Sequence, residues 1–385
     1  MKKILTVVFL VFLGVMCLGT VGKASLRSLG DVYIHYGGGI KGLILTVLDR
    51  SSIENAVKDY TFLHDGLIEL YGASLRAAGV DVLREEDGKV LARLEGDVLV
   101  FVHDAEPEFK PAQRASIEAL HEAAVSSGAE CFFVCIPQKI CPGQSRFCAR
   151  GIADGTAETD KTRMAAFAAA GYSVLDMHAR MHDEGLSHPD LYYRTDHHWT
   201  PQAALWAAGE LARALGVDDA LLAPEKFTVE RHPRFLLGSE AKHFGDLYCP
   251  RDDFDFPLPD FDTELTFQSE DDAPRTGTFA EALLFRDRLT GNPFKTFPYA
   301  IFLNGDYGIQ SIRNLRLPQG KRILLVKDSF SNPMACYLSL VCAEVDLYDP
   351  RHADTPLTAY IRDGGFDAVL VTATSKLEND RFHFQ

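Results

Sequence analysis

Short apolar segments alternate with helical patterns through much of the chain. The segments without a polar face lie at residues 98–102, 130–136, 172–176, 322–326, 344–348 and 366–372. Helical patterns separate them, at residues 111–127, 162–170 and 201–215 and from residues 330 and 355 onward. Strands that are apolar on both faces and alternate with helices are typical of a parallel sheet covered on both sides. The pattern predicts an α/β fold with a doubly wound, three-layer αβα core.

Changes in this pattern divide the chain into five parts. Residues 1–24 are a separate leader, and residues 25–96 form a mixed, partly helical lead-in. The predicted α/β domain then comes in two parts, residues 97–223 and 301–385. Residues 224–300 are rich in Pro, Asp and Phe, and we predict that they are an inserted region of strands and loops.

Three finer features are expected within these parts. Residues 52–78 have apolar positions at the spacing of an amphipathic helix or helix pair, and residues 80–94 resemble two short strands joined at a turn. Residues 251–272 carry nine acidic side chains against one arginine. We expect this acidic stretch to lie outside the parallel sheet, as a solvated rim.

The leader indicates export from the cytoplasm. Lys2 and Lys3 precede an uninterrupted run of apolar and small residues at 4–21, and small residues follow. The length of this run lies between a long signal-peptide core and a short membrane span. It fits either a cleaved signal peptide or a membrane anchor with its positive end inside, and we expect the anchor. The remainder of the chain is then expected in the periplasm or at the cell surface, tethered by the N-terminal segment or otherwise secreted.

Export also bears on the eight cysteines, because disulfides persist outside the cytosol. Cys141 and Cys148 flank a short loop that such a bond could close. Four other cysteines lie in apolar segments, where we expect buried, unpaired thiols: Cys131, Cys135, Cys336 and Cys342.

Composition and net charge narrow the classes of ligand that the protein can bind. The 385 residues are 46% hydrophobic and 24% charged, which is ordinary for a folded protein with a core. The formal net charge is −15, so a nucleic-acid binder that relies on general electrostatic attraction is excluded. Neutral glycans and small acyl groups remain open as ligands.

One candidate for chemistry is the segment Asp196-His197-His198-Trp199. Thr200 and Pro201 predict that a helix begins directly after it, so the segment lies on the loop that enters the helix. A carboxylate two residues from an imidazole can accept the Nδ1–H bond and leave Nε2 free as a general base. An aspartate that merely caps the backbone is the simpler alternative for this segment taken alone.

A second candidate is Ser329, which follows the apolar strand at 322–326 and precedes a helix. Ligands of open α/β sheets bind at the carboxyl ends of the strands, and the first amides of a helix can stabilise an oxyanion. Ser329 is therefore a candidate nucleophile, although Ser329 or Asp328 could instead serve only as a helix cap.

Together these segments resemble the DHHW-motif proteins and the related alginate O-acetyltransferases. The matching residues are Asp196 to Trp199 and the run Lys327-Asp328-Ser329-Phe330-Ser331-Asn332, with further similarity around residues 303–307. The resemblance implies a circularly permuted, flavodoxin-like SGNH-hydrolase fold in which Asp-x-His precedes the serine. It assigns Ser329 as nucleophile, His198 as base and Asp196 as the acid that orients it.

The resemblance also implies substrates and partners. It predicts an O-acetyltransferase or esterase that acts on a cell-surface or secreted polysaccharide through an acyl-enzyme, without a cofactor or metal. A membrane O-acyltransferase would supply the acyl donor. Arg351 and Asn304 are candidates for oxyanion or substrate binding. Trp199 could stack on a sugar, although a tryptophan beside a helix start is more often part of the core.

Two other functions compete with this one. Five histidines fall within residues 178–198 together with several aspartates, so a metal-dependent hydrolase is possible. The chain could also be a glycan-binding or assembly protein that uses the same cleft without turnover. Dependence of acyl turnover on Ser329 and sensitivity to chelators distinguish the three.

Overall fold

The computed structural model describes residues 10–11, 14–15, 33–37, 39–48, 63–84, 90–102, 109, 111–137, 139, 155–270 and 272–372. The chain divides into two compact units, Met1–Ala77 and Ala78–Gln385. In the first unit, α3 spans Gly39–Leu48 and α5 spans His64–Ala77. The described parts contain no helix that is both long and apolar enough to cross a membrane. The predicted leader lies almost entirely outside the described residues.

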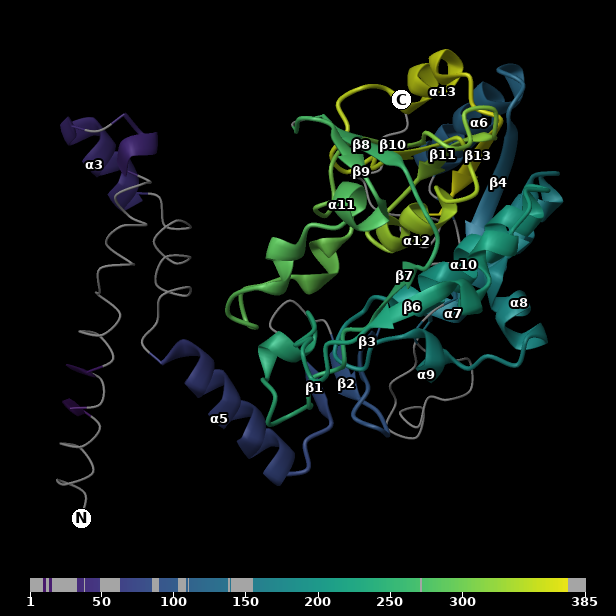
Figure 1. Cartoon of the computed structure of the whole chain (residues 1–385). Helices are drawn as coiled ribbons and strands as arrows, with labels where there is room; N and C mark the ends of the chain where they lie inside the picture. Colours follow the sequence, from purple (N-terminus) through teal and green to yellow (C-terminus); the bar gives the residue numbers. More distant parts are fainter. Residues whose placement is uncertain are drawn as a thin grey trace. The chain divides into compact units, whose positions relative to one another are not determined.

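Eight strands of the second unit form its main sheet (Figure 1). Their order is β5 (Ser173–Asp176), β4 (Glu130–Cys135), β13 (Ala368–Val371), β11 (Arg322–Val326), β12 (Glu344–Tyr348), β10 (Ile309–Asn314), β8 (Leu265–Ser269) and β9 (Arg275–Gly277). The first five strands are parallel, and the last three continue the sheet in antiparallel pairs. β11 lies between β13 and β12, as befits a strand that is apolar on both faces.

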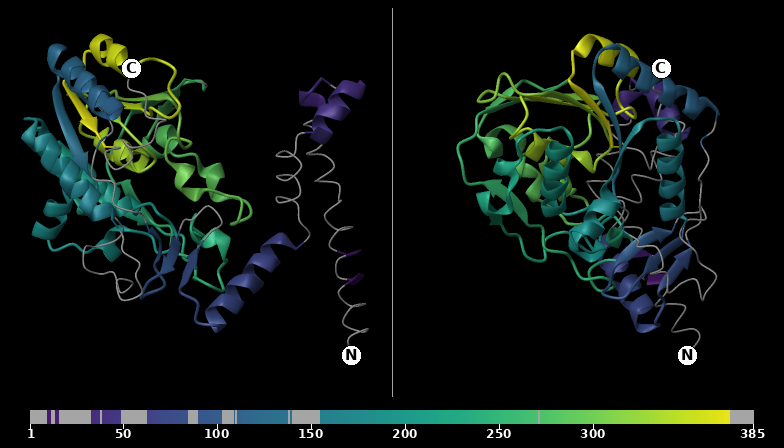
Figure 2. Two further views of the ribbon diagram at one scale, coloured as in Figure 1. Left: turned by 180° about the vertical axis from the view of Figure 1, so that it is seen from behind. Right: turned by 90° about the vertical axis from the view of Figure 1, so that its right-hand side faces the viewer.

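Helices cover both faces of this sheet. Ile323 and Leu325 of β11 face a core that includes α10 (Pro201–Ala214) and α12 (Ser331–Leu338). Leu324 and Val326 face the opposite core, with α6 (Pro111–Ser126), α7 (Thr156–Ala169) and α13 (Leu357–Gly364). Both views of Figure 2 show α6 beside α13. The predicted αβα layering is confirmed, because alternate side chains of an apolar strand need a helix on each side.

Residues 98–102 do not join the parallel sheet, contrary to the expectation. Here β3 (Leu99–Val102) pairs antiparallel with β2 (Val90–Arg93), which also pairs with β1 (Val82–Arg84). Gly96 and Asp97 have φ angles of 78° and 60°, and this left-handed pair turns the chain straight back. A hairpin therefore forms where a strand of the parallel sheet was expected.

The acidic stretch 251–272 also departs from its expected place. Its first part forms β7 (Phe256–Pro259), which pairs with β6 (Phe227–Glu230) outside the main sheet. Its second part is β8, which lies in the main sheet against β10. Leu265 and Phe267 alternate on one face of β8 and are fully buried, so this apolar pair outweighs the charge around it.

The shorter helices lie in the connections. They are α8 (Met177–Asp183), α9 (His188–Leu191), α11 (Phe279–Leu283) and the 3₁₀ turn η6 (Pro298–Ile301). The four cysteines expected to be buried and unpaired are so, and this prediction is confirmed. Cys141 and Cys148 lie outside the described residues.

Candidate active site

The turn after β11 presents Ser329 at the carboxyl edge of the parallel strands. Four of the five β11 residues are buried, and the chain leaves the sheet at Lys327. Asp328 Oδ1 accepts a hydrogen bond from the Phe330 N–H at 3.0 Å, which closes the turn before α12 begins. Asp328 is thus the residue that caps this turn, and the Ser329 hydroxyl remains available for another partner.

That partner is His198. Its Nε2 lies 2.7 Å from Ser329 Oγ, and its Nδ1 lies 2.6 Å from Asp196 Oδ1. Thr200 caps α10 as predicted, accepting a bond from the Ala203 N–H at 3.2 Å. The structure therefore brings together Ser329, His198 and Asp196, which lie 131 and 2 residues apart in the sequence. The arrangement can carry out nucleophilic chemistry of the Ser-His-Asp type.

Asp196 is held as a carboxylate. It is buried, which by itself raises its pKa, but His198, His197 and the Ser239 N–H together keep that pKa well below the usual value. The Ser239 N–H donates to Oδ2 at 2.7 Å, and the His198 N–H donates to Oδ1 at 3.0 Å. Such donors favour the charged form, which can then orient the imidazole.

Residues 238–241 hold the backbone that carries Asp196. The Gly238 N–H donates to Thr195 Oγ1 at 3.1 Å, and the Ala241 N–H donates to the Thr195 carbonyl at 3.1 Å. On the other side, Asp252 Oδ2 accepts from the Thr195 N–H at 2.7 Å and from its hydroxyl at 2.6 Å. Two loops from the inserted region, one at residues 238–241 and one at Asp252, thereby fix the position of Asp196.

Gly238→Ala is expected to disrupt this contact. An added Cβ would lie 2.2 Å from the Thr195 carbonyl oxygen, and backbone cannot yield as a flexible side chain can. We expect a loss of about 3 kcal/mol in the free energy of unfolding, together with a fall in acyl turnover, measured by urea denaturation and ester hydrolysis. Gly209→Ala is the matched control, because its Cβ meets only the end of Arg213 at 3.4 Å. Equal stability of both variants would contradict the prediction.

Lys139 and Glu240 form a further support that the sequence did not indicate. Lys139 Nζ donates to the carbonyls of Asp196 at 2.7 Å and Arg194 at 3.2 Å, and to Glu240 Oε2 at 2.6 Å. Burial raises the pKa of Glu240 to about 7, although Lys139 opposes the shift. Lys139 follows β4 at the carboxyl edge of the sheet. This position is the only feature of the sequence that could have pointed to Lys139 as part of the site.

Aromatic rings enclose the imidazole of His198. The Tyr299 ring stacks on it with centroids 4.0 Å apart and planes at 19°, and the His197 ring lies 3.9 Å away. Phe330 lies at 5.1 Å. His197 is also hydrogen-bonded to Ser239 Oγ at 2.9 Å, so it borders the site without contacting Ser329. Tyr299 was not among the predicted residues, because nothing in the sequence connects it to residue 198.

The contacts of Lys327 explain why a lysine precedes the turn at Asp328 and Ser329. Its fully buried Nζ donates to Asp306 Oδ1 at 2.7 Å and to Asn332 Oδ1 at 2.9 Å, and Asp349 Oδ2 lies 3.4 Å away. Burial would raise the pKa of Asp306, but Lys327 and Arg351 hold it well below the usual value. This buried cluster of charges anchors the start of α12 next to Ser329.

The other predicted residues have different surroundings. Arg351 is held by Asp349, with Nε to Oδ1 at 2.8 Å, and by Asp306 Oδ2 at 2.8 Å. Asn304 Oδ1 accepts from Arg288 Nη2 at 2.6 Å, and among the described residues no hydrogen bond joins it to the triad. Both remain candidates for contacts with the oxyanion or the substrate.

Trp199 is not available for stacking on a sugar. It is fully buried, and its Nε1–H donates to the Phe330 carbonyl at 2.9 Å. The sugar-binding interpretation of Trp199 is therefore wrong, and the core interpretation holds. Its indole instead links the loop that carries His198 to the residue after Ser329.

Part of the histidine-rich segment brings possible metal ligands together. Within the described residues, the group whose ligand atoms lie close together is Asp196, His197 and His198, all within 4.8 Å. His178 and His182 contact each other, with ring centroids 5.2 Å apart. His198 offers one nitrogen to Asp196 and the other to Ser329, so a metal there would compete with the hydrogen bonds of the triad.

Comparisons with known proteins agree with this fold. Residues 100–288 match the family model of the SGNH hydrolase-like domain of the acetyltransferase AlgX. PatB1 from Bacillus cereus is 18% identical, with a TM-score of 0.58 over 77% of this chain and 100% of that chain. A PatB1 structure with a sulfonyl adduct is 17% identical, with a TM-score of 0.56 over 79% of this chain and 99% of that one. No curated protein matches the chain.

A solved DHHW family protein from Eubacterium siraeum is also similar, at 17% identity and a TM-score of 0.56 over 78% of this chain and 96% of that one. The part that matches the family model contains Asp196 and His198, and Ser329 lies beyond it. The resemblance inferred from the sequence is thus confirmed: residues 100–288 are similar to the SGNH hydrolase-like domain of the acetyltransferase AlgX, and the chain shares its fold with a DHHW family protein.

Proposed function

We propose that this protein is a serine O-acyltransferase or carbohydrate esterase that acts on O-acetyl groups of a polysaccharide outside the cytoplasm. The observation that carries the proposal is the continuous chain of contacts from Asp196 through His198 to Ser329, at 2.6 and 2.7 Å. Residues from the two predicted parts 97–223 and 301–385 both contribute to it. The acetyltransferase description of the matching family model supports acetyl as the transferred group.

In the proposed reaction, His198 Nε2 takes the proton of Ser329 as Oγ attacks the acyl carbon of the donor. The Ser329 N–H has no acceptor among the described residues, so it is free to stabilise the oxyanion. The donor oxygen then leaves with the proton from His198, and an acyl-enzyme remains. A sugar hydroxyl, or water, next gives its proton to His198 and attacks the acyl carbon, which restores the Ser329 hydroxyl.

Other aspects of the proposal come from the sequence and from relatives. The leader at residues 1–24 would tether the protein to the membrane, near a membrane acyltransferase that supplies the acyl donor. The sulfonyl adduct in the PatB1 structure suggests that a sulfonyl fluoride is a suitable probe here as well. Arg351 lies just beyond the carboxyl end of β12 and is proposed to contact the substrate or the oxyanion.

A direct experiment is to incubate the full chain with 4-nitrophenyl acetate, with and without an oligosaccharide acceptor. We expect one acetyl group on the peptide that contains Ser329, and acetylated oligosaccharide when the acceptor is present, both detected by mass spectrometry. A parallel sample with a sulfonyl fluoride should be labelled on the same peptide. Turnover without any modification of Ser329, abolished by a chelator, would instead favour the metal-dependent hydrolase.

A further inference from the structure

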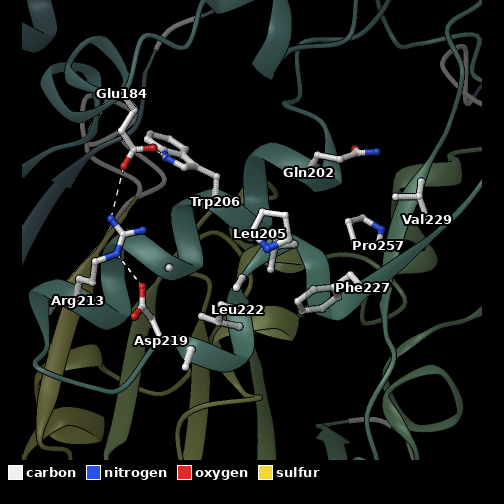
Figure 3. A pocket seen from close by; sticks show the side chains of 14 residues that line it. Glu184, Gln202, Leu205, Trp206, Arg213, Asp219, Leu222, Phe227, Val229 and Pro257 are labelled. Atoms are coloured by element: carbon white, nitrogen blue, oxygen red, sulfur yellow. Dashed lines mark hydrogen bonds and ion pairs between the residues drawn. The ribbon is translucent and has the colours of Figure 1, made fainter.

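A pocket of about 430 Å³ lies along α10, and none of Ser329, His198 and Asp196 lines it (Figure 3). Its lining comes from α10, from Glu184 just after α8, from residues 219–220 and 222–224, and from β6 and β7. The volume is within the range of sites for small molecules. The pocket is therefore large enough to have a ligand of its own.

One wall of the pocket is polar and held in place. Trp206 Nε1 donates to Glu184 Oε2 at 2.7 Å, and Arg213 Nε donates to Asp219 Oδ2 at 2.7 Å. Arg213 Nη1 also reaches Glu184 Oε1 at 3.5 Å, and Figure 3 shows these groups on the same side of the pocket. Arg213 also pairs with the buried Glu210. The indole and the charged groups are thus fixed before any ligand arrives, while Glu184, Arg213 and Asp219 remain open to solvent.

The remaining wall is apolar apart from Gln202. Leu222, Phe227 and Pro257 line it, and Leu205 lies between the two sides (Figure 3). A sugar ring has the same division, with hydroxyls at its edge and C–H groups on its faces. A hydrocarbon chain would cover the charged wall without forming hydrogen bonds to it, which is costly.

Charge further narrows the ligand. Glu184 and Asp219 face the pocket with one compensating cation, Arg213, so an anionic group would meet an excess of negative charge. We propose that this pocket is a binding site for a neutral saccharide, with the ring against Trp206 and Leu205 and its hydroxyls on the carboxylates. The inference rests on the proposed function only in taking this saccharide to be a stretch of the acceptor polysaccharide.

The two tryptophans of the chain make the test direct, since Trp199 is fully buried and Trp206 lines the pocket. The full chain is titrated with neutral pentasaccharides (maltopentaose, cellopentaose, chitopentaose) and with pentagalacturonate, and tryptophan fluorescence is recorded. We expect a saturable change with at least one neutral sugar, at a Kd of about 1 mM or below, and at least tenfold weaker binding of the uronate.

Variants assign the binding to the pocket. Trp206→Leu should remove the fluorescence change and weaken binding about tenfold or more, as measured by saturation-transfer NMR. Asp219→Asn, which keeps the size of the side chain, should weaken binding several-fold even if Trp206→Leu folds poorly. Leu221→Ala is the control, because Leu221 is exposed nearby but does not line the pocket, and it should bind as the wild type does.

The proposal is overturned if no neutral sugar binds at about 10 mM. It is overturned equally if binding survives Trp206→Leu and Asp219→Asn unchanged, or if the uronate binds more tightly. Because binding requires no turnover, each of these results leaves the proposed acyl transfer at Ser329 untouched. Conversely, absence of Ser329 acetylation would not affect the outcome of the titration.

Discussion

Ser329→Ala is expected to reduce kcat/KM for hydrolysis of 4-nitrophenyl acetate by on the order of 10⁴-fold. Removal of Oγ takes away the atom that would form the acyl-enzyme, and the remaining groups could assist only direct attack by water. The fold should survive, because Asp328 rather than Ser329 closes the turn before α12. Ester hydrolysis and urea denaturation of the same preparation separate the two effects.

Variants of His198 and His197 provide the comparison for the turnover of Ser329→Ala. His198→Ala should be as damaging as Ser329→Ala, since His198 Nε2 is the group 2.7 Å from Oγ. His197→Ala should reduce turnover by less than about tenfold, because His197 contacts Ser239 and not Ser329. Wild-type turnover in Ser329→Ala would rule out the acyl-enzyme, and the opposite ranking of the histidines would show that the base was assigned to the wrong imidazole.

The parts of the site that could be predicted are those that local sequence determines. Ile323 to Val326 leave no polar face, so β11 had to be an inner strand, and the residue after its turn had to lie at the carboxyl edge of the sheet. Thr200 and Pro201 likewise fixed the start of α10, and with it the loop that carries Asp196 and His198.

What could not be predicted depends on contacts between distant segments. Gly238 and Asp252 hold Thr195 from more than 40 residues away, and Lys139 reaches the same loop from another strand. No periodicity marks such residues. The exclusion of β3 from the parallel sheet was decided by the turn at Gly96 and Asp97, whereas an apolar run by itself is compatible with either kind of sheet.

Asp196→Asn tests the remaining member of the triad, and we expect it to lower kcat about 10⁴-fold. Its two carboxylate oxygens accept from the N–H groups of Ser239 and His198. An amide can place its oxygen toward only one of them, and with the oxygen toward Ser239 its NH₂ faces His198 Nδ1. The imidazole then takes the wrong tautomer, with Nε2 protonated and unable to accept the Ser329 proton. Near-normal turnover in this variant would show that Asp196 does not orient His198.

The pH dependence of stability provides a second measurement on the same variant. The pKa of Asp196 is well below its usual value in the folded protein, because the opposing effect of burial is outweighed by His198, His197 and the Ser239 N–H. Since an unfolded aspartate titrates near pH 3.9, the carboxylate stabilises the fold fully above that pH and loses this contribution as the pH falls toward its folded pKa. The free energy of unfolding of the wild type should therefore exceed that of Asp196→Asn at about pH 5, and the difference should shrink below about pH 4. Urea denaturation from about pH 3 to 5 measures this difference, and a gap that widened on acidification across this range would mean that the carboxyl is protonated in the folded protein.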